Sequence, residues 1–490
     1  MSLDPRTPVL VGAGQVNQRE ECAGNEPVDL MAAAAREAAD PRVLAAVDSI
    51  RVVNLLSWRY RDPGLLLGAR VGAPEAATQY SGIGGNTPQS LVNQACVDIQ
   101  QGRADAVLLA GGETWRTRMR LRAKGIRPEW TRQDESVPVP PGAGTDVPMA
   151  GPGEDLIGLD RPSFVYPLFE QALRIAAGES IEDHQRRVGD LWAGFSAVAA
   201  GNPHAWVREQ MSAEQITQPS ADNRMISWPY PKLMNSNNMV DQAAVVVLCS
   251  AEKAERLQIP RDTWVFPHAG TESHDTYLIG ERRDLHRSPA IRIAGRRVLE
   301  LAGVDVDDLD FVDLYSCFPS AVQVAAHELG IPTDRPLTVT GGLTFAGGPW
   351  NNYVMHSIAT MAEVLRRNPG SRGLVTANGG YLTKHSFGVY STTPPARPFR
   401  REDVQAEVDR EPTRTTLVGW EGTGSVESWT VPFDRDGKPE KAFLAVRTPG
   451  GERVLAVVAD ADTASAAVTQ DIAGASVRVH ADGRADLVDG

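Results

Sequence analysis

The sequence predicts an α/β protein made of two related halves, followed by a smaller β-rich tail. Three observations predict this fold class. Strand-like and helix-like segments alternate over the first hundred residues, which is typical of α/β folds. A strand, a turn of small residues and a helix follow one another at two separate places, which suggests two related halves. Past Pro394 the pattern changes to short alternating segments joined by turn pairs.

The first half contains one especially clear strand–helix unit. Asn86-Thr87-Pro88-Gln89 supplies an N-cap and an early proline for a helix with one apolar face. The other elements expected here are an apolar strand at Val9–Gly12, a helix around Leu30–Ala39, a strand near Ile50–Leu56 and a strand at Ala106–Ala110. Together they predict a sheet with helices packed against it.

A long excursion interrupts this half. From Gly125 to Pro162 the chain is crowded with Pro, Gly and Asp, which favours a surface path over a core element. Helical segments near Val165–Ala177 and Ile181–Ala200 follow it. We therefore expect residues 117–235 to form an inserted loop domain.

The second half repeats the strand–turn–helix pattern. After the apolar strand Ala243–Leu248, the strand Phe311–Leu314 runs through Tyr315-Ser316-Cys317-Phe318-Pro319 into a helix that ends near Gly330. A glycine-rich turn at Gly341–Pro349 precedes the helix Met355–Leu365, and the strand Leu374–Ala377 leads into Asn378-Gly379-Gly380. The expected halves are residues 1–245 and 246–395.

The tail, residues 396–490, has the sequence pattern of a small β domain. Alternating stretches lie at Trp429–Pro432, Ala442–Val446 and Val454–Val458, with the turn pairs Asp436-Gly437 and Gly450-Gly451 between them. This spacing predicts an all-β barrel or sandwich.

Composition excludes several classes of protein. The 490 residues are 42% hydrophobic and 23% charged, which fits a soluble enzyme and excludes disordered or collagenous chains. The formal charge of −13 would repel phosphate backbones, so nucleic acid is not an expected partner. Because we find no apolar run of about 18 residues and no basic-then-apolar start, we expect no membrane span and a cytoplasmic location.

The four cysteines, Cys22, Cys96, Cys249 and Cys317, lie far apart without a CxxC pair. A disulfide framework or structural zinc site is therefore not supported. The sequence likewise gives no evidence for a metal or redox cofactor.

Taken together, these segments resemble the thiolase superfamily, in particular its lipid-thiolase branch that includes the sterol-carrier-protein thiolases. The resemblance covers about residues 5–395, and the tail resembles the additional carboxy-terminal domain of thiolase-like protein type 1. It implies two βαβαβαββ halves in five α-β-α-β-α layers, with an OB-like β domain appended. It also implies one acyl-CoA site surrounded by four loops, at Gly84–Ser90, Tyr315–Phe318, Gly341–Pro349 and Thr376–Gly380.

The chain departs from this family at the residues that carry thiolase chemistry. A thiolase takes up the acyl group on a cysteine at the start of the first long helix, and that position falls on Asn86. The family's Gly-His-Pro triplet, whose histidine acts as the base, reads Gly347-Gly348-Pro349 here. The second, Cys-x-Gly loop matches Ala377-Asn378-Gly379. We expect Asn86, Gly348, Pro349, Asn378 and Gly379 to line the substrate pocket.

Three residues remain as candidates for general acid/base catalysis. Cys317 matches the family's acid/base cysteine and precedes a helix whose dipole would lower its pKa; the alternative is a packed core residue. Tyr315 is either a proton donor to a substrate oxygen or the buried end of a strand. His385 follows the fourth loop and either points at the pocket or has a structural role. By contrast, Cys96 falls on the apolar face of its helix and is expected to be core.

The basic segment Arg116–Arg122 opens the excursion, whose counterpart in the family covers the CoA nucleotide. Arg116 and Arg118 would meet the CoA phosphates there, or they belong to a solvated basic face. Gly12-Ala13-Gly14 resembles the start of a dinucleotide fingerprint but lacks its third glycine.

Two functions are compatible with these residues. In the first, the protein binds acyl-CoA or a related lipid thioester, of fatty-acid or sterol metabolism, without ordinary thiolysis and with no other cofactor. In the second, it is an active carbon–carbon bond enzyme, either an acetyl-CoA acyltransferase with unusual residues or a retro-aldol lyase on 3-hydroxyacyl-CoA that uses Tyr315 or Cys317. The sequence leaves open both this choice and whether the protein is a monomer or a homodimer.

Overall fold

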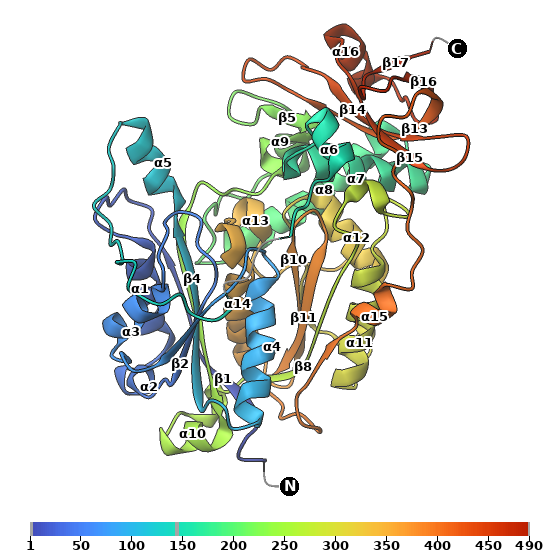
Figure 1. The fold of residues 1–490 in the computed structure, drawn as a ribbon. Coiled ribbons are helices and arrows are strands. Elements are labelled where there is room, and N and C mark those ends of the chain that lie inside the picture. Colours follow the sequence, from blue (N-terminus) through green and yellow to red (C-terminus); the bar gives the residue numbers. More distant parts are fainter. Residues whose placement is uncertain (1–2, 143–146, 489–490) are drawn as a thin grey trace.

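The computed structural model describes residues 3–142 and 147–488. The chain forms two mixed sheets with helices between and around them, and a third sheet that contains the tail strands (Figure 1). This arrangement confirms the predicted α/β fold with a carboxy-terminal β domain.

The first sheet has five strands in the order β1-β7-β4-β2-β3. Antiparallel pairs join β7 to β1 and β4, whereas β2 runs parallel to β3 and β4. All ten residues of β7 are buried, as expected of an apolar strand at the inside of a sheet. The strands are β1 (Pro8–Asn17), β2 (Ser49–Val52), β3 (Ala77–Tyr80), β4 (Ala106–Thr114) and β7 (Asp241–Ser250).

Four helices connect these strands: α1 (Pro27–Ala38), α2 (Pro41–Ala45), α3 (Pro63–Val71) and α4 (Thr87–Gln100). The first three cover the outer face of the sheet, and α4 lies on the inner face (Figure 1). A Cβ on Gly14 would lie 2.1 Å from the Ala34 oxygen, and one on Gly12 would lie 2.6 Å from the Ala38 oxygen. Close packing of α1 on β1 therefore explains the two glycines that resemble a dinucleotide fingerprint.

The second sheet follows the order β12-β8-β11-β10-β9. Its strands are β8 (Phe266–His274), β9 (Phe311–Asp313), β10 (Arg372–Gly379), β11 (Lys384–Ser391) and β12 (Arg400–Asp403). Helix α10 (Ala251–Arg256) follows β7 and packs against the first sheet. The helices that follow β8 are α11 (Pro289–Ala302), α12 (Pro319–Leu329), α13 (Gly342–Phe345) and α14 (Tyr353–Arg367). Because α4 and α14 lie between the two sheets and α11 lies outside the second, the layers alternate α-β-α-β-α (Figure 1).

The two halves differ at one strand. The first half reads βαβαβαββ, but in the second half, within the described residues, no strand follows α12 in the place that β3 takes in the first. The segment is joined to β9 by a backbone hydrogen bond from the Leu314 N–H to the Leu337 oxygen at 3.0 Å, and by Asp313 Oδ2, which accepts from the Val339 N–H at 2.9 Å. The second sheet instead gains β12 at its other edge, beside β8.

The excursion packs above the sheets and joins the tail. It contains α5 (Trp115–Ala123), α6 (Pro152–Ile157), α7 (Pro162–Ala177), α8 (Ile181–Gly201), α9 (Ala213–Thr217), β5 (Met225–Trp228) and β6 (Tyr230–Pro231). Strand β5 pairs antiparallel with a tail strand through Trp228 and Val431. The tail is thus attached to the loop domain through a continuous ladder.

The tail sheet has the strand path β15-β14-β13-β16-β17. The elements are α15 (Gln405–Val408), β13 (Gly422–Pro432), β14 (Ala442–Arg447), β15 (Arg453–Val458), α16 (Ala461–Thr469), β16 (Ser476–Val479) and β17 (Ala485–Leu487). The three predicted strands are present, but the sequence analysis missed helix α16. Asp460 caps this helix by accepting a hydrogen bond from the Thr463 N–H at 2.8 Å.

In the described parts of the chain, no helix is both long enough and apolar enough to cross a membrane.

Candidate functional site

A cavity of about 500 Å³ lies where the four predicted loops meet, under helix α7. Each loop contributes to its wall: Gly84 and Gly85 from the first, Tyr315, Cys317 and Phe318 from the second, Leu343 from the third, and Asn378, Gly379 and Gly380 from the fourth. Strands β9 and β10 are parallel neighbours, so the turns after them lie at the same edge of the sheet. The four loops that the resemblance implies therefore border one cavity.

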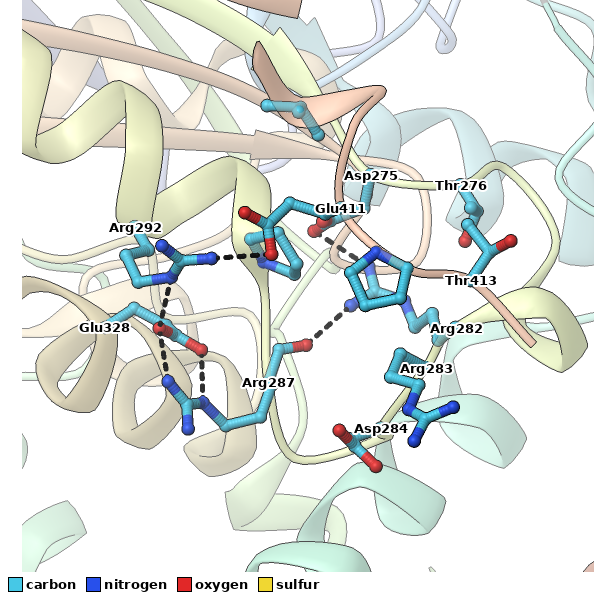
Figure 2. A pocket seen from close by; sticks show the side chains of 13 residues that line it. Asp275, Thr276, Arg282, Arg283, Asp284, Arg287, Arg292, Glu328, Glu411 and Thr413 are labelled. Atoms are coloured by element: carbon cyan, nitrogen blue, oxygen red, sulfur yellow. Dashed lines mark hydrogen bonds and ion pairs between the residues drawn. The ribbon is translucent and has the colours of Figure 1, made fainter. Parts of the chain in front are cut away.

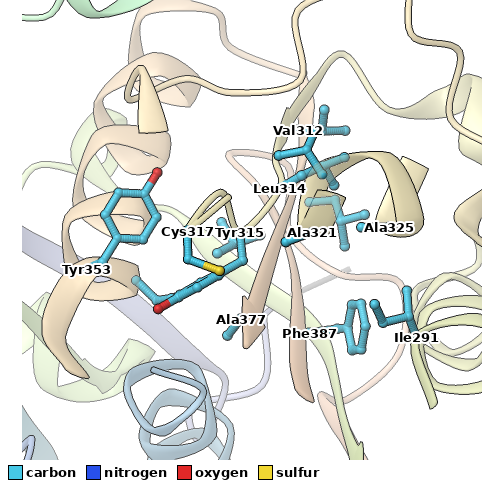
Figure 3. Packing of buried hydrophobic residues seen from close by; sticks show 14 of the residues in the cluster. Ile291, Val312, Leu314, Tyr315, Cys317, Ala321, Ala325, Tyr353, Ala377 and Phe387 are labelled. Atoms are coloured by element: carbon cyan, nitrogen blue, oxygen red, sulfur yellow. The ribbon is translucent and has the colours of Figure 1, made fainter. Parts of the chain in front are cut away.

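Tyr315 and Cys317 lie side by side at the end of β9 (Figure 3). The Tyr315 backbone N–H donates to Thr376 Oγ1 at 2.9 Å, which fixes the turn against β10. A Cβ added to Gly85 would lie 2.4 Å from the Tyr315 hydroxyl, so this glycine leaves room for the phenol. Burial, and after it the neighbouring Cys317, raise the pKa of Tyr315 well above its usual value. Tyr315 is therefore a proton donor and not a phenolate at neutral pH.

Cys317 does not have the low pKa expected from its place before a helix. Burial raises the pKa of this thiol to about 12, and hydrogen bonds from Tyr166 and Asn378 offset only part of that rise. The helix-dipole expectation is wrong because the excursion helix α7 covers the residue and desolvation outweighs the dipole. Cys317 is a neutral thiol at neutral pH.

Tyr166, from α7, organises the fourth loop. Its hydroxyl accepts hydrogen bonds from Asn378 Nδ2 at 2.9 Å and from the Leu382 N–H at 2.8 Å, and it lies 3.2 Å from the Gly380 oxygen. Asn378 Nδ2 also lies 3.9 Å from Cys317 Sγ. The excursion thus supplies a buried side chain that connects the second and fourth loops, which the sequence analysis missed.

Asn86 lies at the N-cap of α4, but its side chain makes no capping hydrogen bond. Its Oδ1 would be 2.4 Å from a Cβ on Gly84 and 2.6 Å from one on Gly379. The atom is buried, and no partner for it is found in the described chain. The amide therefore lies between the first and fourth loops, just behind the cavity wall.

The third loop lies beside the cavity but contributes little to its wall. Gly348 and Pro349 are buried and outside the lining. A Cβ on Gly348 would lie 2.9 Å from Asn238 Oδ1, so Asn238 occupies the space next to it. Trp350, which does line the cavity, adopts φ 48° and packs edge-on against Trp115 at 4.8 Å.

His385 does not face this cavity. It is buried on β11 and lines a separate small cavity that also touches Tyr315 and Asn378. Its Nε2 lies 3.2 Å from the Leu382 oxygen and 3.6 Å from Asp275 Oδ2. Of the two alternatives for His385, the geometry favours the structural one, because its imidazole is buried against Leu382 and Asp275 and lies outside the lining of the main cavity.

Arg116 and Arg118 lie on α5, near the cavity but not in its wall. Arg118 Nη1 donates to the Leu56 oxygen at 2.9 Å, and Leu56 itself lines the cavity. Arg116 lies over the Trp206 ring and donates to the Arg19 oxygen at 2.8 Å. Both guanidinium groups are held by backbone oxygens or rings, and α5 projects from the first sheet (Figure 1).

Within the described lining, Lys384 is the only charged residue, and no histidine, aspartate or glutamate is present. Lys384 Nζ donates to the Ile83 oxygen at 2.7 Å, beside the first loop. Nothing in the sequence pattern marked Lys384, because a lysine at the start of a strand gives no signal of a place in a cavity wall. Cys96 is fully buried in α4, and burial raises its pKa, in agreement with the predicted core position.

Comparisons with known proteins cover the whole chain. Residues 403–484 match the family described as the thiolase-like protein type 1 additional C-terminal domain. A crystal structure of a monomeric SCP2-thiolase like protein type 1 from Mycobacterium smegmatis is 32% identical, with a TM-score of 0.84, and the match covers 99% of this chain and 100% of that one. The Ltp2–ChsH2(DUF35) aldolase is 18% identical with a TM-score of 0.61, over 80% of this chain and 99% of that one, which shows a shared fold only.

Among curated proteins, an acetyl-CoA acetyltransferase of Methanothermobacter thermautotrophicus is 26% identical over 220 residues, 41% of this chain and 55% of that protein. The acetyl-CoA acetyltransferase of Methanocaldococcus jannaschii is 23% identical over 178 residues, 36% of this chain and 42% of that protein. The chain thus spans about half the length of the curated relatives it matches.

Proposed function

The chain belongs to the SCP2-thiolase-like proteins of type 1 in the thiolase superfamily, and we propose that it binds acyl-CoA or a related lipid thioester without ordinary thiolysis. One observation carries the proposal: the described wall of the 500 Å³ cavity has no histidine or carboxylate, and its thiol has a pKa of about 12. Thiolysis needs an ionised thiol and a base. A wall of neutral polar groups and apolar side chains with one lysine suits binding better than acyl transfer.

The residues at the two key family positions support the same proposal. Asn86, at the start of α4, carries an amide that forms no transferable acyl intermediate. Gly348 has no side chain to act as a base, and Asn238 borders the space beside it. We infer that Asn378 and Gly379 border the bound acyl group, whereas Asn86, Gly348 and Pro349 shape the wall from behind.

The CoA nucleotide has a candidate place along α5. Arg118 contacts the backbone of Leu56, a cavity residue, so its guanidinium lies close to the mouth. Arg116 lies on the same helix, and the two arginines would hold phosphate oxygens by paired hydrogen bonds. If so, Arg118→Ala should weaken binding of acetoacetyl-CoA, and Arg186→Ala, an exposed arginine of α8, should not. Unchanged affinity in Arg118→Ala would remove α5 from the CoA site.

The test of the main proposal combines two measurements on the full chain. Intact-protein mass spectrometry after incubation with acetoacetyl-CoA should show no added acetyl group, whereas titration calorimetry should show binding. Tyr315→Phe and Cys317→Ala should leave that binding in place. An acetyl group mapped to Cys317 or another side chain would refute the non-thiolytic reading, and an absence of binding would refute the thioester site.

A retro-aldol lyase is the second candidate, because Tyr315 and Cys317 lie together in the wall. A retro-aldol cleavage needs no acyl-enzyme, only an acid/base at the 3-hydroxyl and a site for the enolate oxygen. The Tyr315 hydroxyl would accept the proton of the 3-hydroxyl and pass its own proton to the enolate carbon once the carbon–carbon bond has broken, while Lys384 would stabilise the enolate oxygen. Turnover of a 3-hydroxyacyl-CoA that Tyr315→Phe abolishes would establish this activity in place of binding alone.

A monomeric state is consistent with one feature of the first sheet. Strand β3 is an edge strand, and such edges readily pair with another chain. Here the Tyr80 N–H donates to the Pro141 oxygen at 3.1 Å, so the excursion covers part of the edge. We propose that the chain is a monomer, like its Mycobacterium smegmatis relative, which light scattering on a sizing column would test.

A further inference from the structure

A second cavity, of about 260 Å³, lies at the seam between the second sheet and the segment that leads into the tail. Its wall is formed by the loop between β8 and α11, the end of α12 and residues 408–413 (Figure 2). Four arginines line it, namely Arg282, Arg283, Arg287 and Arg292. Four carboxylates line the same cavity, namely those of Asp275, Asp284, Glu328 and Glu411.

The carboxylates at the seam are shared between arginines. Glu328 lies 2.6 Å from Arg287 Nε and 3.8 Å from Arg292 Nε, so one carboxylate serves two guanidinium groups. Arg292 Nη2 also contacts Glu411 at 2.9 Å, and Asp275 contacts Arg282 at 3.4 Å. These contacts are drawn in Figure 2.

The same sharing continues behind the cavity. Asp284 lies 3.8 Å from Arg414 and 3.9 Å from Arg447, and Glu427 contacts both Arg447, at 3.1 Å, and Arg453, at 2.7 Å. Burial lowers the pKa of Arg414, and the positive charges of Arg447 and Arg453 lower it further. The charges of the cavity wall balance, and the excess positive charge of the seam comes from Arg414, Arg447 and Arg453 behind it. These three arginines share Glu427 and also draw on Asp284 of the wall, which leaves one wall arginine without a carboxylate.

Arg283 holds the unbalanced charge. It is exposed, and in the described chain its guanidinium has no hydrogen-bond or ion-pair partner; Figure 2 likewise draws no contact from it. Arg287 uses Nε and Nη2 on Glu328, which leaves its Nη1 for another acceptor. The Thr413 hydroxyl lines the same cavity. These donors come from two segments of the chain and surround one space.

We propose that this seam cavity binds a small phosphate-bearing anion. Guanidinium groups present paired N–H donors that match two phosphate oxygens, and partly buried sites screen such contacts less than open surface does. The cavity is of a size for a phosphate or pyrophosphate group and is separate from the thioester cavity. An anion here would neutralise Arg283 and hold the tail segment against the second sheet.

Titration calorimetry of the full chain with inorganic pyrophosphate, at an ionic strength fixed with NaCl, tests the proposal. Binding should be measurable, and Arg283→Ala should weaken it roughly tenfold or more, as expected for the loss of a charge-assisted pair. Arg283 is exposed, so the substitution should leave the unfolding midpoint unchanged. Arg484→Ala, an exposed tail arginine paired with Asp482, is the matched control and should bind as the wild type does. No pyrophosphate binding, or equal weakening in both variants, overturns the proposal.

Two further titrations identify the source of the phosphate and separate this site from the thioester site. Adenosine 3′,5′-bisphosphate that binds more tightly than pyrophosphate, and loses that affinity in Arg283→Ala, would indicate a nucleotide; equal affinities would indicate a free anion. Acetoacetyl-CoA binding that survives Arg283→Ala but falls in Arg118→Ala would place the thioester elsewhere. Either function can therefore fail without the other.

Discussion

The side-chain amide of Asn378 donates a hydrogen bond to the Tyr166 hydroxyl at 2.9 Å, which joins the end of β10 to the excursion helix α7. The same hydroxyl accepts from the Leu382 N–H at 2.8 Å. Leu382 has φ 56°, a left-handed conformation that a leucine rarely adopts. One phenol thus holds both the cavity asparagine and a strained backbone segment.

Tyr166→Phe should destabilise the protein. The change leaves the Asn378 amide and the Leu382 N–H buried without their acceptor, which costs about 1–3 kcal/mol. Urea denaturation should show the loss in the free energy of unfolding. Tyr381→Phe is the control, because Tyr381 also lines the cavity but its hydroxyl has no hydrogen bond in the described chain. Equal stability of the two variants would contradict this role of Tyr166.

The high pKa of Cys317 predicts slow alkylation that accelerates with pH. With a pKa of about 12, the thiolate fraction at pH 7 is very small, and it rises roughly tenfold per pH unit below that value. Peptide mapping after iodoacetamide treatment at pH 7 and pH 9 should show this increase at Cys317. Cys22, which is half-buried near the surface, should label first at pH 7. Labelling of Cys317 as fast as Cys22 at pH 7 would mean that the thiol is activated.

Gly85 is predicted to be intolerant of a side chain. A Cβ there would lie 2.4 Å from both the Asn378 backbone oxygen and the Tyr315 hydroxyl. We expect Gly85→Ala to destabilise the protein by about 1–3 kcal/mol through overpacking and to weaken acetoacetyl-CoA binding. Gly194→Ala, in α8 with nothing within 4 Å of the added Cβ, should instead stabilise by roughly 0.5–1 kcal/mol. Thermal unfolding of both variants should show a lower midpoint for Gly85→Ala and a higher one for Gly194→Ala than for the wild type. An unchanged midpoint in Gly85→Ala would contradict the prediction.

The sheets could be predicted because strand–turn–helix units are local patterns, whereas the meeting of the four loops was implied by the family resemblance. Tyr315 and Cys317 follow a predicted strand, and their place in the wall follows from that strand's neighbours. The tail strands could be predicted in the same way, from the alternation of apolar and polar residues along them. Helix α16 was not, because its short alanine-rich segment has only a weak apolar pattern.

Contacts between distant segments could not be predicted from the sequence. Tyr166 meets Asn378 across more than two hundred residues, and nothing in the pattern of α7 marks that side chain. The pKa of Cys317 depends on the same packing, since the helix dipole is visible in sequence but burial under α7 is not. His385 lies outside the main cavity because its imidazole packs against Leu382 and Asp275, and the Asp275 contact joins segments more than one hundred residues apart.

A partly exposed charge network in the excursion predicts how stability depends on acid. Glu179 lies 2.8 Å from Arg187 Nε and 2.5 Å from His184 Nδ1, and these contacts, the Arg187 hydrogen bonds foremost, lower its pKa from 4.5 to about 2. A carboxylate with a depressed pKa stabilises the folded state fully above its unfolded value and loses that contribution as pH falls through the folded value. The contribution of Glu179 should therefore vanish between about pH 4.5 and pH 2.

Glu179→Gln isolates this contribution. We expect the free energy of unfolding of the variant to lie below that of the wild type at pH 5–6, where the carboxylate is ionised and pairs with Arg187. The difference should shrink as pH falls towards 2, because the wild-type carboxylate then takes up a proton and becomes equivalent to the amide. Glu182→Gln, an exposed change in the first turn of the same helix α8, should show no such convergence. Urea denaturation at several pH values measures both variants, and a difference that stays constant down to pH 2 would show that packing, and not the charge of Glu179, stabilises this part of the excursion.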